Sequence, residues 1–304
     1  MVRRFIRFLL CLVGAVLIGG ALFYYVTAPN PLDEAHWQNL GAADVKNGEQ
    51  VFWAGGCTSC HAAPGAEGDQ KLVLSGGLAL KTDFGTFYAP NISPDETAGI
   101  GRWTLAEFGN AVKRGVGPQG EHLFPSFPYG SYARMTDKDV NDLYAYMKTL
   151  PKSANVAPPH QLSFPYNMRI AVGAWKLFYL NDQPRVALVS PSDKVKRGQY
   201  LVEGPGHCGE CHTPRDALGG LKNDLWLAGA PNPEGQGRIP GITPGSDKIS
   251  GWSEADIANY LETGFTPDFD SVGGQMAEVQ QNLSHLPKSD LEAIATYLKA
   301  IPKH

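Results

Sequence analysis

The sequence has few charged residues, and its basic residues do not outnumber its acidic ones. Charged residues make up 18% of the 304 residues, and 26 lysines and arginines face 30 aspartates and glutamates, for a net charge of −4. Soluble domains average about 25% charged residues. The net charge therefore does not favour binding to nucleic acid, and we predict no nucleic-acid partner.

Strand-like alternation is also lacking, and no two segments alternate apolar and polar residues in a way that predicts a hairpin. Apolar residues recur instead at helical spacing, as Leu143, Tyr146 and Leu150 do. Residues 104–114 and 253–262 each begin with a pattern resembling a capping box. The predicted fold class is all-α.

Long apolar runs are absent except at the amino terminus. Residues 8–26 carry no charge and follow Arg3, Arg4 and Arg7. A membrane span needs about 20 apolar residues, and basic residues before it place the amino terminus in the cytoplasm. We predict that residues 1–30 anchor the chain in a bacterial inner membrane, with the remainder in the periplasm. The alternative is a signal peptide cleaved at the small residues of 26–28.

Cysteine is rare, and four of the five cysteines form two Cys-x-x-Cys pairs, each followed at once by a histidine. This pattern is the signature of c-type haem attachment, and it occurs twice. A zinc site made from both pairs is a weaker alternative, because each pair has its own histidine. A thioredoxin-like redox pair is weaker too, since no βαβ pattern surrounds either motif.

The chain repeats itself at an offset of about 150 residues. Cys208 follows Cys57 by 151 residues, and Trp252 follows Trp103 by 149. This repeat predicts two domains, 44–151 and 192–304, joined by a linker, 152–191, that holds one short helix. The expected helices are 45–60, 104–114 and 137–150, then 167–180, then 194–211, 253–262 and 289–301.

Each motif predicts one haem site. Residues three apart on a helix share a face, so two thiols so placed can bond the two vinyl groups of one haem. The histidine that follows is the proximal iron ligand. The predicted residues are Cys57, Cys60 and His61 for the first haem, and Cys208, Cys211 and His212 for the second.

Methionine, the usual sixth ligand of an electron-carrying c-type haem, is also scarce. Met276 is the only methionine of the second domain, and we predict that it binds the second iron from a loop before the last helix. Met135 is the best candidate for the first iron. His122, Met168 and an open, five-coordinate iron remain alternatives, and Met147 falls on the apolar face of its helix.

These motifs resemble those of membrane-anchored dihaem cytochromes c related to the cytochrome subunits of periplasmic alcohol dehydrogenases and of similar quinoprotein, flavoprotein or molybdenum dehydrogenases. The resemblance covers residues 45–304, and it is carried by residues 55–61, 90–94, 99–103, 125–129 and 204–212. It implies two tandem class I cytochrome c domains, two covalently bound haem c groups, and places for Trp103 and Trp252 near the haem propionates.

The sequence departs from the alcohol dehydrogenase subunits in two respects. It has two haem motifs where they have three, and Phe127 stands where they typically carry an axial methionine. In relatives with phenylalanine there, a methionine at the position of Met135 is common.

The predicted function is electron transfer without catalysis. His/Met ligation closes both faces of the iron, which suits a relay. The expected donor is a periplasmic dehydrogenase or a respiratory complex, and the expected acceptor is a quinone, a small cytochrome c or a terminal oxidase. An open first iron, suggested by Phe127, would instead indicate a peroxidase-like enzyme. A purely structural anchor subunit would leave both haem motifs unexplained.

Overall fold

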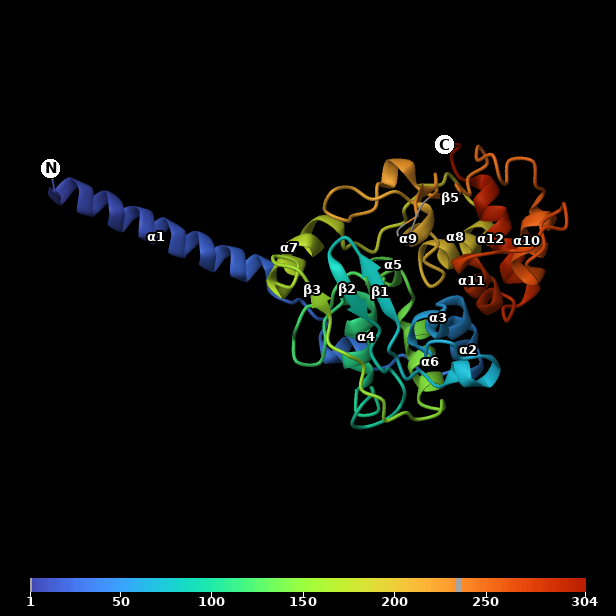
Figure 1. Ribbon diagram of the computed structural model, residues 1–304, viewed down its shortest axis with the longest axis horizontal. Coiled ribbons are helices and arrows are strands. Elements are labelled where there is room, and N and C mark those ends of the chain that lie inside the picture. Colours follow the sequence, from blue (N-terminus) through green and yellow to red (C-terminus); the bar gives the residue numbers. More distant parts are fainter. Residues whose placement is uncertain (1, 233–236) are drawn as a thin grey trace.

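The computed structural model describes residues 2–232 and 237–304. One long helix, α1 (Val2–Thr27), projects from the body that contains the other described elements (Figure 1). By length and composition this helix could cross a membrane, and its large apolar side chains are exposed. The apolar amino-terminal run is therefore helical, as predicted.

The first half of the body contains three helices of about three turns and several short elements. In chain order these are η1 (Glu34–Trp37), α2 (Val45–Ala54), α3 (Cys57–His61), η2 (Gly68–Leu72), β1 (Ala79–Thr82), β2 (Gly85–Tyr88), α4 (Leu105–Arg114), α5 (Tyr129–Tyr132), α6 (Asp137–Met147) and β3 (Gln161–Leu162). Helix α2 packs on α6, and α4 contacts α5 and α6. The predicted capping box is present, since Thr104 and Glu107 bond each other's backbone.

The second half repeats this arrangement. Its elements are α8 (Asp193–Glu203), α9 (Gly209–His212), η3 (Asn223–Leu225), β4 (Ala230–Pro231), β5 (Arg238–Ile239), α10 (Glu254–Thr263), α11 (Gln275–Leu283) and α12 (Lys288–Ala300). Helix α8 packs on α12, as α2 packs on α6, and α10 also packs on α12. Ser253 and Asp256 form the second predicted capping box.

Both main helix crossings depend on a glycine. A Cβ added to Gly48 of α2 would overlap the carbonyl oxygen of Asp142, and one added to Gly198 of α8 would overlap that of Ala293. Any larger side chain would therefore push the two helices apart. Ala293 follows Asp142 by 151 residues, so the crossing is built in the same way in the two halves.

Helix α7 (Arg169–Tyr179) lies within the predicted linker and packs against the end of α1 (Figure 1). The contact is close, because a Cβ on Gly173 would overlap the carbonyl oxygen of Thr27. Thr27 is 2% exposed. The last residue of α1 is therefore built into the folded body.

The expectation of no paired strands is wrong. Strands β1 and β2 form an antiparallel hairpin that β3 extends, and β4 pairs with β5. Strands of two to four residues are too short to show a recognisable alternation in sequence. The chain is mostly helical rather than entirely so.

The first helix of each half is shorter than predicted. It ends at Ala54 or at Glu203, and a residue in the left-handed region lies between it and the short helix of the haem motif. Gly56, with φ of 57°, separates α2 from α3. His207, with φ of 37°, lies between α8 and α9. The first haem motif therefore occupies a short helix of its own, and the second begins at Cys208, the residue just before its short helix.

Candidate functional site

The first motif forms α3, which packs against the core of the first half. Cys57 contacts an apolar cluster that also includes Trp103, Phe127 and Met135. His61 ends the helix, and its Nδ1 lies 2.8 Å from the carbonyl oxygen of Pro90. A carbonyl only accepts hydrogen bonds, so Nδ1 carries the ring proton and Nε2 keeps its lone pair.

The second motif repeats this geometry around α9. His212 Nδ1 donates to the carbonyl oxygen of Pro240 at 2.7 Å. Burial lowers the pKa of His61 and of His212, which keeps both imidazoles neutral. A neutral histidine whose Nδ1–H is held by a backbone carbonyl is the form that binds a metal through Nε2. The donor sets of both motifs therefore fit haem iron.

The carbonyls of Pro90 and Pro240 are functional groups that the sequence reasoning missed. The matching segments 90–94 and 240–244 were recognised as part of the repeat, but no role followed from the match. Two proline-containing segments that recur at a fixed distance from a ligand are the signal that could have found them.

The zinc alternative finds no support in the geometry. The described residues contain no group of three or more His, Cys, Asp and Glu side chains arranged to hold a metal ion. The two cysteine pairs lie in different halves, and each packs on its own core.

Met135 lies just before α6, as predicted, and is 3% exposed in the same apolar cluster as Cys57. Lys113 Nζ donates to its carbonyl oxygen at 2.8 Å, which fixes the backbone that presents this side chain. Met147 is equally buried, on α6. The prediction that Met147 belongs to the core is confirmed, and the ligand role of Met135 stays a prediction.

Met276 does not lie in a loop. It occupies the first turn of α11, a helix that precedes the last helix and was not predicted. Gly273 and Gly274 led to the prediction of a loop. In the structure Gly274 is the residue just before the helix, with φ of 59°. Met276 packs on the same core as Cys208, so the two halves match here too.

The alternative first-haem ligands lie elsewhere. His122 Nε2 donates to the carbonyl oxygen of Thr27 at 2.8 Å, and its Nδ1 lies 3.1 Å from Lys176 Nζ. Both ring nitrogens are therefore engaged away from the first core. Met168 precedes α7 and is 43% exposed.

Trp103 and Trp252 occupy equivalent places in the two halves. Each backbone N–H donates to a residue three positions earlier, Ile100 or Ile249, at 3.1 Å. Trp103 packs on the first core and Trp252 on the second. A place near the haem propionates stays a prediction for both.

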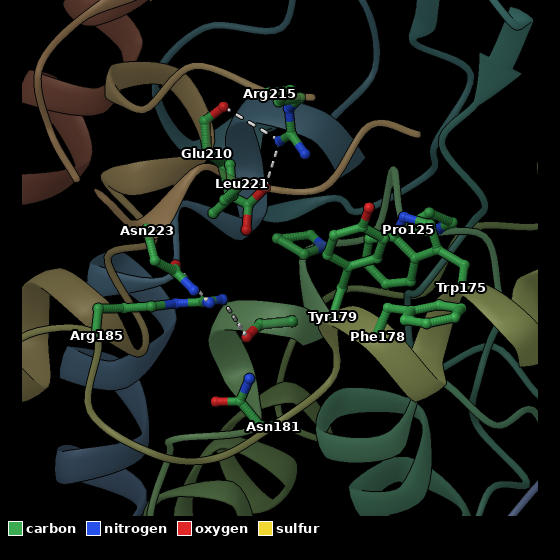
Figure 2. Close-up of a pocket in the computed structure, with 12 residues that line it drawn as sticks. Pro125, Trp175, Phe178, Tyr179, Asn181, Arg185, Glu210, Arg215, Leu221 and Asn223 are labelled. Carbon is green, nitrogen blue, oxygen red and sulfur yellow. Dashed lines mark hydrogen bonds and ion pairs between the residues drawn. The ribbon is translucent and has the colours of Figure 1, made fainter. Parts of the chain in front are cut away.

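A small hollow lies where α7 meets the two halves (Figure 2). Trp175 and Tyr179 of α7 line one side of it, and Arg185, Glu210 and Arg215 line the rest. Arg215 pairs with Glu210 in this hollow. Burial raises the pKa of Glu210, but Arg215 and a hydrogen bond from Ser131 outweigh it and hold that pKa below its ordinary value.

The comparisons with known proteins agree with this geometry. The cytochrome c family profile matches residues 45–151. Over 290 residues the chain is 52% identical to a "Diheme cytochrome c-type" protein of Cereibacter sphaeroides. The aligned region covers 95% of this chain and 96% of that protein. The chain belongs to the dihaem c-type cytochromes. It is an electron-transfer protein with two covalently bound haem c groups.

This dihaem cytochrome is also related to the cytochrome subunits of bacterial dehydrogenases. It is 38% identical over 261 residues to the fructose dehydrogenase cytochrome subunit of Gluconobacter japonicus, with 85% of this chain covered. It is 37% identical over 280 residues to the cytochrome c subunit of alcohol dehydrogenase (quinone) of Gluconobacter oxydans, with 88% covered. The cytochrome spans 52% and 57% of those two subunits, so they are the longer proteins.

Proposed function

We propose that this dihaem cytochrome relays single electrons from a periplasmic dehydrogenase to the respiratory chain, where a quinone, a small cytochrome c or a terminal oxidase accepts them. In this proposal residues 44–151 and 192–304 are tandem class I cytochrome c domains, and 152–191 is the linker. The observation that carries it is the histidine–carbonyl pair built twice, at His61 with Pro90 and at His212 with Pro240.

Cys57 and Cys60 would attach the first haem, and Cys208 and Cys211 the second. When bound, each haem supplies one-electron chemistry at its iron. The carbonyls of Pro90 and Pro240 orient the proximal imidazoles and hold the proton on Nδ1.

Met135 and Met276 are the proposed sixth ligands. Met135 is buried in the first core, and Met276 is partly buried against the second. A thioether ligand raises the reduction potential, and a closed iron does not bind small ligands. Both properties suit a relay rather than an enzyme.

The two attachment segments touch each other, which supports transfer between the haems. Gly55 lies just before the first motif, and its carbonyl oxygen accepts from Tyr132 Oη at 3.0 Å. His207 immediately precedes Cys208, and its Nε2 lies 3.3 Å from the same oxygen. One peptide group is thus shared by both halves beside both motifs.

We further propose that α1 is retained as the membrane anchor and that the haem domains lie in the periplasm of a bacterium. Cleavage after residue 28 would remove Thr27, whose carbonyl oxygen receives the His122 hydrogen bond. It would also uncover Gly173, which fits closely against the same carbonyl. These two contacts support retention of α1.

The donor is proposed from the names of the relatives, which are cytochrome subunits of fructose and alcohol dehydrogenases. Outside residues 1–30 the chain has 23 basic and 30 acidic residues, and this net charge of −7 suits a donor with a neutral or basic docking face. Association should then weaken as salt concentration rises.

Low-temperature EPR of the oxidised full-length protein, with haem content and intact mass, tests the proposal. Two low-spin His/Met signals, two haems per chain and a mass that includes residues 1–28 are expected. A high-spin signal that disappears on adding cyanide would favour the peroxidase-like alternative. A mass without residues 1–28 would contradict the anchor.

A further inference from the structure

Asn282 is a buried amide that connects the two halves of the molecule. It lies on α11 and is 3% exposed. Its Oδ1 accepts from Thr58 Oγ1 at 2.7 Å, and its Nδ2 donates to Ser59 Oγ at 2.8 Å. Thr58 and Ser59 are the two residues between the cysteines of the first motif. A helix of the second half therefore binds the first attachment segment through both the oxygen and the nitrogen of one side-chain amide.

The same helix also carries Met276, the proposed sixth ligand of the second iron. Asn282 Nδ2 donates in addition to the carbonyl oxygen of Glu278 at 2.7 Å, which fixes the amide against the helix backbone. Helices α3 and α11 contact each other across the boundary between the halves (Figure 1). The position of α11 thus depends on the first motif.

The reverse contact exists at the equivalent place. Ser131, on α5 and 1% exposed, donates from Oγ to Glu210 Oε1 at 2.7 Å. Glu210 lies between the cysteines of the second motif, beside the hollow of Figure 2. The turn that contains Ser131 continues directly to Met135, since Met135 N donates to the carbonyl oxygen of Tyr132 at 2.9 Å.

These two contacts are related by the sequence repeat. Asn282 follows Ser131 by 151 residues, and Glu210 follows Ser59 by 151 residues. The two halves therefore face each other with an approximate two-fold relationship. In each contact, the segment that presents one proposed sixth ligand bonds the haem motif of the other half.

We propose that Ser131 and Asn282 are positioning residues that couple the two haem sites to each other. Each holds the axial-ligand segment of its own half against the haem motif of the opposite half. The inference rests on the proposed ligand roles of Met135 and Met276. Its consequence is that a change at either residue alters the haem of the opposite half, although the residue touches neither iron.

The physical basis is the cost of leaving these buried groups without partners. An unpaired buried polar group is destabilising, so loss of one side of the contact forces the loop and the helix to rearrange. A ligand segment that shifts by a fraction of an ångström changes the bond it offers to the iron. Hydrogen bonds around a haem are among the factors that set its potential.

The two contacts differ in charge. Asn282 is neutral and meets two hydroxyl groups, whereas Ser131 meets a carboxylate that Arg215 also binds. Removing Ser131 leaves the negative charge of Glu210 less compensated beside the second motif. A less compensated negative charge stabilises ferric iron, so the second potential should fall.

The test is a spectroelectrochemical titration of both haems in the full-length protein. Met135→His and Met276→His assign the two potentials, because each should lower that of its own haem. Asn282→Ala should shift the first potential by about 30 mV, which is roughly a threefold change in a one-electron equilibrium constant, tenfold being 59 mV. Ser131→Ala should lower the second potential.

Gln281→Ala is the matched control. Gln281 neighbours Asn282 on α11 and also bonds across the halves, since its Oε1 accepts from Lys71 Nζ at 2.8 Å, which lies outside both motifs. Its removal should leave both potentials unchanged. Thr58→Val removes only the hydroxyl that donates to Asn282 Oδ1 and keeps the shape of the side chain. This variant replaces Asn282→Ala in the test if Asn282→Ala does not fold.

A second potential that shifts in Asn282→Ala while the first does not would overturn the proposal, because α11 would then act only on its own haem. Equal shifts in Gln281→Ala and Asn282→Ala would overturn it as well. If Met276→His and Met135→His move neither potential, the ligand assignment itself has failed. That outcome is distinct from a failure of the coupling.

Discussion

The side chain of His122 donates its Nε2 proton to the carbonyl oxygen of Thr27 at 2.8 Å, so the carboxyl end of α1 is held by the first half of the body. The ring's other nitrogen then accepts from Lys176 of α7. Three segments that lie far apart in sequence meet at one imidazole.

This junction predicts a stability loss in Gly173→Ala. The added methyl group would overlap the carbonyl oxygen of Thr27. This oxygen belongs to the backbone and cannot rotate away as a side chain could, so α1 and α7 must separate. Overpacking of this kind costs about 1–3 kcal/mol in the free energy of unfolding. Gly130→Ala is the control, because its new Cβ meets nothing within 4 Å. Thermal unfolding of both variants measures the difference, and equal melting temperatures would contradict the contact.

Lys176 predicts a pH dependence of stability. Burial chiefly, and then Arg114, lower the pKa of Lys176 to about 7, against about 10.4 in an unfolded chain. Between these values the unfolded chain binds a proton that the folded chain has lost, so this group makes the free energy of unfolding rise with pH. Below pH 7 both states are protonated and the rise stops.

Lys176→Met removes the titrating group. The stability of the wild type minus that of the variant should therefore increase from pH 7 to about pH 10. Chemical denaturation at a series of pH values measures this difference. A difference that is flat or falls over this range would show that the buried amine stays charged.

The proposed axial ligands predict different spectra for three methionine variants. Met135→Ala and Met276→Ala should each convert one haem to a high-spin form that binds cyanide, because the iron loses its sixth ligand. Met147→Leu keeps the volume of a core side chain, so it should leave both haems low-spin and cost less than about 1.5 kcal/mol. EPR and the methionine–iron charge-transfer band report the outcome. A low-spin first haem in Met135→Ala would point to another ligand.

The hydrogen bond of Tyr297 predicts that equivalent tyrosines in the two halves contribute unequally to stability. Its hydroxyl donates to the buried carboxylate of Glu203 at 2.6 Å. Tyr297→Phe should lower stability by about 1.5–3 kcal/mol, the range for hydrogen bonds to charged groups. The equivalent residue in the first half is Tyr146, where Phe52 replaces the glutamate. Tyr146→Phe should therefore cost much less in the same denaturant titration.

The features that local chemistry determines could be predicted from the sequence. The apolar amino-terminal helix, the capping boxes at Thr104 and Ser253, and the burial of Met147 all agree with the structure. Each follows from residues within a few positions of one another. The repeat also agrees, because Gly48 and Gly198 make the same crossing.

The features that were missed depend on residues far apart in the chain or on elements too short to show a period. The hydrogen bonds of Asn282 reach residues 223 and 224 positions away, and no sequence pattern marks them. The strands β1 and β2 have four residues each. Helix α11 was hidden by Gly273 and Gly274, which occur equally in loops and before helices.

The lock between Thr27 and the body also limits how the cytochrome meets other proteins. With α1 in the bilayer, the haem-bearing halves cannot swing on a long tether, because only a few residues separate Thr27 from the first packed segment at η1. If α1 is retained as the proposed anchor, the search for partners is a lateral one within the membrane plane. A membrane-bound donor would then meet the flank of the body.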